Sequence, residues 1–216
     1  PAINYIRIGS ELSCDERFRE KLVENVLISF DNRSDVRQCL SACRVYVGTV
    51  ASISSNPELF KLKHFDVAII DEATQILEPQ LLWILTAKSS EGQHAVDKFV
   101  LIGDHKQLPA VVLQNKESSE VYDEGLRNIG LYNLKDSLFE RLYRFHLQEE
   151  DSSALDMLFK QGRMHPDVAS FPNQAFYGGR LEPVGLPHQM EEISAPVLFL
   201  PSQRDMENLS GKTNRY

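Results

Sequence analysis

Two apolar segments of the chain each end in polar side chains that could bind a nucleotide together with a metal ion. The first segment covers residues 65–70 and leads directly into Asp71 and Glu72. The second covers residues 98–103 and leads into a polar loop that carries Gln107. Open α/β sheets place ligand sites at the carboxyl ends of their strands. The two segments therefore predict one site at one edge of a sheet.

The residue types at these ends suit the chemistry of phosphoryl transfer. Asp71 can hold Mg²⁺, because this hard cation prefers oxygen ligands alongside nucleotide phosphates. Glu72 can orient or deprotonate the water that attacks a γ-phosphate. Gln107 can donate to a phosphate oxygen and accept from water at once, so it could sense the γ-phosphate. Alternatively, Asp71 and Glu72 could cap a helix that starts near Glu78, and Gln107 could simply face solvent.

A third polar stretch, residues 161–166, carries Arg163. A guanidinium that reaches a γ-phosphate would stabilise the charge on the transferring oxygens. Out of context, such an arginine is more often a surface residue in a weak salt bridge. In the same stretch, His165 is interpreted as a structural hydrogen-bonding residue without a carboxylate partner.

Strands and helices that alternate along the chain must position these residues. Strands are predicted at residues 3–9, 44–50, 66–71, 98–103, 155–159 and 196–200, and helices at 14–29, 78–85, 137–144 and 167–176. β-branched and aromatic residues indicate the strands, and apolar residues at helical spacing indicate the helices. The alternation predicts an α/β fold with a mostly parallel sheet and flanking helices. The polar run at residues 147–153 is the predicted linker.

The composition is that of an ordinary soluble protein, with 42% hydrophobic and 25% charged residues. A net charge of -8 argues against a generally basic nucleic-acid binder, although a local basic groove stays possible. Cys14, Cys39 and Cys43 are predicted to be free thiols, because no His or Cys pair completes a zinc site. No apolar run approaches the ~20 residues that span a bilayer. No signal-peptide pattern opens the chain, so a cytoplasmic setting, or a nuclear one in a eukaryote, is expected.

The polar stretches resemble motifs of the superfamily 1B helicases, in particular the branch of the nonsense-mediated-decay helicase and the replication helicase–nucleases. The resemblance covers about residues 43–182. Three segments carry it, in the family's order: Asp71–Gln75 (motif II), Gly103–Pro109 (motif III) and Gln161–Pro166. It implies a RecA-like, P-loop NTPase fold. Residues 1–150 would be the C-terminal part of one RecA-like domain, and residues 151–216 the start of a second.

The resemblance also implies roles for single residues. Asp71 matches the family's Mg²⁺ ligand and Glu72 its catalytic acid. Gln107 matches the motif III glutamine, and Arg163 matches an arginine that contacts the γ-phosphate of ATP. Thr49 matches a nucleic-acid contact. ATP and Mg²⁺ are thus the expected cofactors, single-stranded DNA or RNA and the rest of the helicase chain are the expected partners, and movement is expected to run 5′ to 3′.

Two departures from the family pattern affect this interpretation. Gly162 stands where the family usually has tyrosine, and no Gly-x-x-x-x-Gly-Lys-Ser/Thr phosphate loop occurs in the 216 residues. The chain is therefore expected to be an internal piece of a helicase that hydrolyses ATP poorly by itself. A degenerate helicase domain that binds nucleic acid or protein without catalysis is the alternative. A generic kinase or ATPase would leave residues 100–112 and 161–166 unexplained.

Overall fold

A computed structural model describes residues 4–115, 117–150, 152–184 and Val197. The chain divides into two compact units, Pro1–Ala154 and Leu155–Tyr216, which we describe separately. The predicted assignment of residues 1–150 and 151–216 to two RecA-like domains stays a prediction. Among the described residues, no helix is both long and apolar enough to cross a membrane.

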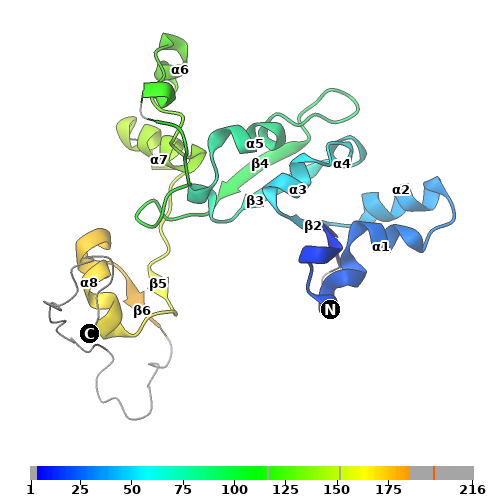
Figure 1. Ribbon diagram of the computed structural model, residues 1–216, viewed down its shortest axis with the longest axis horizontal. Coiled ribbons are helices and arrows are strands. Elements are labelled where there is room, and N and C mark those ends of the chain that lie inside the picture. Colours follow the sequence, from blue (N-terminus) through cyan, green and yellow to red (C-terminus); the bar gives the residue numbers. More distant parts are fainter. Residues whose placement is uncertain (1–3, 116, 151, 185–196, 198–216) are drawn as a thin grey trace, which may run out of the picture. The chain divides into compact units, whose positions relative to one another are not determined.

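The first unit alternates short strands with short helices (Figure 1). Its strands are β1 (Tyr5–Ile8), β2 (Val45–Gly48), β3 (Phe65–Ile70) and β4 (Val96–Leu101). Its α-helices are α1 (Val23–Ile28), α2 (Arg33–Ala42), α3 (Val50–Ser54), α4 (Glu58–Leu62), α5 (Glu78–Leu85), α6 (Glu124–Asn128) and α7 (Leu138–Gln148). Its 3₁₀ turns are η1 (Glu11–Ser13), η2 (Glu16–Lys21), η3 (Ala73–Gln75) and η4 (Glu117–Ser119).

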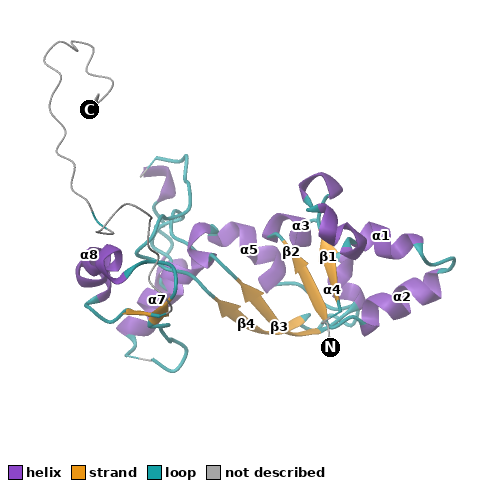
Figure 2. Ribbon diagram, turned by 90° about the horizontal axis from the view of Figure 1, so that it is seen from below, coloured by secondary structure: helices purple, strands orange, loops and turns teal. Residues whose placement is uncertain are grey.

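The strands of the first unit form two parallel pairs, β1 with β2 and β3 with β4 (Figure 2). The register places Ile6 opposite Tyr46 and Ile69 opposite Val100. In the second unit, β5 (Lys160–Gln161) pairs in parallel with β6 (Glu182–Pro183), and α8 (Pro166–Tyr177) lies between them in sequence. The predicted α/β class with parallel strands is confirmed, and each sheet of the described residues has two strands.

Two of the predicted elements are wrong in detail. The helix predicted at 14–29 is interrupted at Leu22, whose extended backbone bridges to Arg7 of β1 and whose side chain is buried. This tertiary contact outweighs the helical spacing of the apolar residues. The strand predicted at 155–159 is irregular, and β5 starts only at residue 160. The strand predicted at 196–200 lies outside the described residues, apart from Val197, which is in no regular element.

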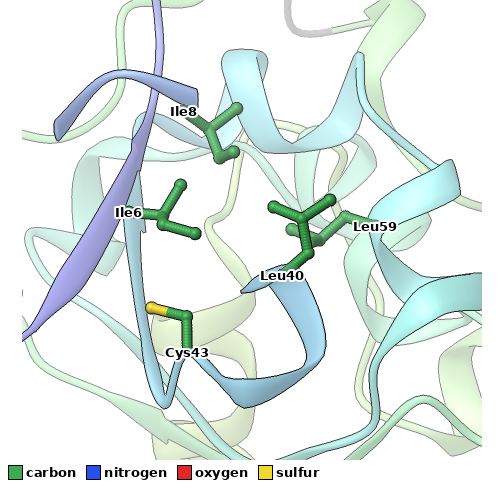
Figure 3. Close-up of a cluster of buried hydrophobic side chains, with 5 residues drawn as sticks. All are labelled: Ile6, Ile8, Leu40, Cys43 and Leu59. Atoms are coloured by element: carbon green, nitrogen blue, oxygen red, sulfur yellow. The ribbon is translucent and has the colours of Figure 1, made fainter. Parts of the chain in front are cut away.

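One apolar core holds β1 and β2 to the helices beside them. Ile6 and Ile8 of β1 pack against Leu40 of α2, Cys43 directly after α2, and Leu59 of α4 (Figure 3). All five are at least nine-tenths buried, which makes this cluster a main source of stability for the N-terminal segment. The helix that delivers Leu40 and Cys39 was not among the predicted elements.

Tyr46 of β2 links this core to β3. Its hydroxyl donates to the carbonyl oxygen of Leu40 at 2.5 Å, and burial raises the pKa of the tyrosine. Its ring meets the Phe65 ring edge-on at 5.5 Å between centroids. Such edge-to-face pairs add to the burial of the rings themselves. β2 is thereby tied to the strand that leads into Asp71.

α3 and α5 cover one face of the β3–β4 pair (Figure 1). Val50 and Ile53 of α3 pack against two clusters of buried apolar residues. The clusters combine residues of α5, the strands and neighbouring segments, among them α4 and α7: Phe60, Ile84, Ala87, Ala95 and Val96 in one, and Ile70, Ala73, Leu81 and Leu138 in the other. The alternate strand residues Val67, Ile69 and Val100 are exposed. Because strand side chains alternate between faces, the pair is covered on one side only among the described residues.

Candidate nucleotide site

Asp71 and Glu72 follow β3 directly and are both exposed. Glu72 has a left-handed backbone conformation, with φ of 52° and ψ of 37°, which typically costs a non-glycine residue about 1 kcal/mol or more. The Glu72 amide donates to Asp71 Oδ1 at 3.0 Å, and Gln75 Nε2 donates to Glu72 Oε2 at 3.2 Å. This tight turn presents both carboxylates at the end of the strand.

The alternative in which these carboxylates cap the following helix is wrong. The first residue before α5 is Leu77, and its amide donates to the side chain of Gln80 at 3.0 Å. Glu72 stands before η3 and caps no amide of that turn. Neither carboxylate is therefore used to start α5, and both remain available for a ligand.

The loops after β3 and β4 lie against each other. The amide of Ala73, three residues beyond β3, donates to the carbonyl oxygen of Ile102, one residue beyond β4, at 2.8 Å. A Cβ atom on Gly103 would lie 3.0 Å from Thr74 Cγ2 and 3.1 Å from the Thr74 nitrogen. Glycine is needed here because the two backbones approach so closely. As predicted from the sequence, the polar ends of the two strands meet at one edge.

Asp104 holds the side chain of Gln107. Gln107 Nε2 donates to Asp104 Oδ2 at 2.8 Å, and the Gln107 amide donates to the Asp104 carbonyl at 3.1 Å. The Lys106 amide donates to Asp104 Oδ1 at 2.9 Å. The aspartate thus organises the loop around an exposed glutamine. The sequence leaves two roles open for Asp104, a hydrogen bond within its loop or a pair with a basic group, and the structure shows the first.

His105 of the same loop points toward α7. Its ring centroid lies 4.4 Å from that of Tyr143, with the planes inclined by 33°. Burial lowers the pKa of His105, and the charge of neighbouring Lys106 lowers it further. The neutral imidazole is therefore the form that the fold favours beside the aromatic ring.

Thr49 lies between β2 and α3, at the same end of its strand as Asp71 is of β3. Its hydroxyl oxygen accepts from the Ser52 amide at 3.1 Å, and the hydroxyl donates to Ser52 Oγ at 2.8 Å. Threonine is a common residue at the start of a helix for this reason. The side chain is exposed, and its role as a nucleic-acid contact stays a prediction.

Arg163 belongs to the second unit, in the turn between β5 and α8. The side chain of Gln161 shapes this turn: its Oε1 accepts from the amides of Arg163 and Met164 at 3.0 and 2.8 Å. Its Nε2 donates to the Met164 carbonyl at 2.9 Å. The Arg163 guanidinium is exposed and forms no ion pair within the described part of the chain.

His165 starts α8, where its Nδ1 accepts from the Asp167 amide at 3.2 Å. This confirms a structural hydrogen-bonding role. A carboxylate does stand nearby in sequence, contrary to the expectation: Asp167 Oδ2 lies 3.7 Å from His165 Nδ1, the atom that accepts from the Asp167 amide. The first turn of the helix brings the two residues together.

The carboxylates after β3 fit a magnesium ion better than a transition metal. Among the described residues, no group of three or more His, Cys, Asp or Glu side chains could hold a metal. Mg²⁺ in nucleotide sites commonly takes only one or two carboxylates and completes its shell with phosphates and water. Asp71, exposed at a strand end and oriented by the Glu72 amide, meets that requirement.

Comparisons with known proteins agree with this arrangement. Two sequence families, each described as an AAA domain, match residues 10–115 and 134–213. The Gallus gallus DNA replication ATP-dependent helicase/nuclease DNA2 is 30% identical over 83% of the chain and 16% of its own length. An uncharacterized ATP-dependent helicase of Methanocaldococcus jannaschii is 31% identical over 76% of the chain and 20% of its own length.

The chain belongs to the superfamily 1 helicases of the nonsense-mediated-decay and replication helicase–nuclease type. A third relative, the DNA-binding protein SMUBP-2 of Mesocricetus auratus, is 32% identical over 76% of the chain. This helicase chain spans 15% to 20% of the lengths of these three relatives. The AAA matches imply a P-loop NTPase fold, of which the described strands form small parallel pairs.

Some features of the candidate site could not be predicted by motif reading. Tyr143 carries no local signal for its contact with His105, which is 38 positions away in sequence and forms only in the folded chain. The left-handed conformation of Glu72 is likewise unexpected for a glutamate. The sequence also did not single out Gln107 as the partner of the Asp104 carboxylate.

Proposed function

We propose that the full-length protein carrying this chain is an ATP-dependent helicase or translocase that moves along single-stranded nucleic acid. The observation that carries the proposal is the close packing of the motif II and motif III loops through Gly103 and Thr74. It supports a single site at which Asp71, Glu72 and Gln107 face solvent together. Such a site suits a nucleoside triphosphate and its metal ion.

In this proposal, each exposed side chain has a separate chemical task. Asp71 holds Mg²⁺, which when bound neutralises charge on the phosphates. Glu72 accepts a proton from the water that attacks the γ-phosphorus, while the bond from that phosphorus to the bridging oxygen breaks and ADP leaves. Gln107 donates to a γ-phosphate oxygen from a loop that Asp104 keeps in shape. Arg163 of the second unit stabilises the charge of the transferring group.

ATP binding and phosphate release would drive movement by changing the contacts of Gln107 and Arg163 with the γ-phosphate. We propose movement in the 5′ to 3′ direction on DNA or RNA, with Thr49 among the residues that contact the strand. The names of two relatives refer to DNA replication and DNA binding, which favours a nucleic-acid partner for this chain as well. The net charge of -8 predicts weak strand binding by the isolated 216 residues.

A strand-stimulated ATPase assay on the full-length protein tests this function. Single-stranded DNA or RNA should raise the rate of phosphate release, and a duplex with a 5′ tail should be unwound in preference to one with a 3′ tail. The isolated 216-residue chain should hydrolyse ATP poorly. Strand binding without any ATP hydrolysis by the full-length protein would instead support a non-catalytic binding module.

A further inference from the structure

Helix α7 contacts both loops of the candidate nucleotide site, although it lies outside the segments that match the helicase motifs. Ser137 starts the helix: its hydroxyl oxygen accepts from the Glu140 amide at 3.2 Å, and the Glu140 side chain accepts from the Ser137 amide at 3.5 Å. This reciprocal capping fixes where the helix begins. One face of the helix then packs inward, through Leu138, Phe139 and Leu142.

The first contact of α7 is with the motif II segment. Leu138 is buried in one cluster with Ala73, which itself follows Glu72. The backbone of Ser137 forms an antiparallel bridge with Leu77, the residue that precedes α5. The start of α7 is therefore packed against both ends of the turn that carries the catalytic glutamate.

An ion pair strengthens this contact. Arg141 Nη2 and Nε lie 2.6 and 2.7 Å from the two carboxylate oxygens of Glu78, in the first turn of α5. The two side chains are only 11% and 13% exposed. A bidentate pair of this kind, in which two guanidinium nitrogens donate to the two oxygens of one carboxylate, is among the stronger and more directional interactions in proteins. It fixes α7 relative to the helix that follows motif II.

The second contact of α7 is with the motif III loop. Tyr143 packs against the His105 ring at 4.4 Å, and Phe139 stacks on Tyr143 at 6.5 Å with the planes only 10° apart. Phe139 and Tyr143 are one helical turn apart, so they form a row on one face of α7. His105 lies between Asp104 and Gln107, the pair whose hydrogen bond orients the glutamine.

We propose that Tyr143 is a positioning residue that, through His105, holds the motif III loop and its Gln107 in place against motif II. α7 is the rigid support for this contact, because Arg141 and Leu138 attach the same helix to the motif II side. The role of the loop in catalysis rests on the proposed function. The attachment of the loop to α7 does not, and it can be measured separately.

Hydrogen–deuterium exchange of the full-length protein tests the attachment. The amides of Lys106 and Gln107 are hydrogen-bonded to Asp104 in the ordered loop. Loss of one aromatic contact in Tyr143→Ala should speed their exchange roughly threefold to tenfold. Tyr143→Phe keeps the ring and should exchange like the wild type. Tyr122→Ala is the matched control, because Tyr122 is exposed and hydrogen-bonds to Glu120 instead.

ATPase kinetics on the same variants test the catalytic consequence. Tyr143→Ala should lower kcat roughly threefold to tenfold, with less change in KM for ATP. Tyr143→Phe, which retains the ring, should keep a kcat close to that of the wild type. Unchanged loop exchange in Tyr143→Ala, or an equal increase in Tyr122→Ala, would overturn the positioning role. Wild-type protein without ATPase activity would overturn the proposed function, while the exchange comparison would still decide whether α7 holds the loop.

Discussion

At the scale of single residues, the candidate site depends on a few close contacts that leave little room for substitution. Gly103 allows the motif III loop to approach Thr74, and Asp104 orients the side chain of Gln107, three residues further along the loop. Glu72 adopts a left-handed conformation that glycine would adopt more easily. Such a conformation persists in a non-glycine residue only where the surrounding structure holds the backbone in place.

Gly103→Ala should destabilise the chain, because the added Cβ would press against the backbone and side chain of Thr74. We expect a loss of about 1–2 kcal/mol in the free energy of unfolding. Gly9→Ala is the matched control, since no heavy atom lies within 4 Å of a Cβ at that position. Its effect should stay within about 0.5 kcal/mol. Equal effects of the two substitutions in urea denaturation would contradict the close approach of the loops.

His64 should titrate above the usual histidine range, because Asp97 Oδ2 lies 3.0 Å from its Nε2 and raises its pKa. Because the pKa is higher in the folded state, protonation of His64 stabilises the fold at pH values below its pKa in the unfolded state. This contribution is lost as the pH rises through the pKa in the folded state. Asp97→Asn should lower the pKa of His64 in an NMR titration. Asp66→Asn, which removes a weaker contribution, should lower it less. The reverse order would show that the hydrogen bond to Asp97 is not the main cause.

At the scale of elements, α7 and α5 are joined by the ion pair between Arg141 and Glu78, whose side chains are largely buried. Arg141→Met would leave Glu78 without its partner in a setting where it is 13% exposed. We expect a loss of about 3 kcal/mol in the free energy of unfolding. The double variant with Glu78→Leu should recover much of this loss, because it leaves no unpaired charge. Urea denaturation followed by circular dichroism measures the free energy of unfolding of the single and the double variant. A loss below about 1 kcal/mol in Arg141→Met would show that the ion pair contributes little to holding α7 against α5.

The elements that local sequence predicts best are those next to the site. β-branched and apolar residues predict the strands β3 and β4. Apolar spacing and the position of proline predict the helices α5 and α8. Prediction failed where tertiary contacts decide the backbone. Leu22 leaves the helical conformation to bridge to β1, and the segment before residue 160 stays irregular.

The site was predictable to the extent that it depends on strand ends. Strands that run in parallel deliver their carboxyl ends to one edge, so Asp71 and the motif III loop could be placed together from sequence alone. The contact between His105 and Tyr143 could not be predicted, because no periodic sequence pattern links an aromatic residue of a loop to one of a distant helix. The relation of Arg163 to these residues depends on a second unit and stays a prediction.

At the scale of the whole molecule, the chain carries its helicase-family segments in two separate units. It lacks the glycine-rich phosphate loop, and it matches 15% to 20% of the length of three relatives. One face of the β3–β4 pair is exposed at Val67, Ile69 and Val100, whereas parallel sheets are normally covered on both faces. We therefore expect catalysis and strand movement to be properties of the full-length protein.

The most direct test of this account is the rate of ATP hydrolysis by the full-length Glu72→Gln protein on saturating single-stranded nucleic acid. The amide keeps the size of the side chain but cannot accept the proton of the attacking water. We predict that kcat falls by about 100-fold or more while ATP binding, measured by equilibrium titration, stays within about threefold of wild type. Glu124→Gln, at an exposed carboxylate of helix α6, should behave like wild type. Near-normal hydrolysis by Glu72→Gln would contradict the central claim.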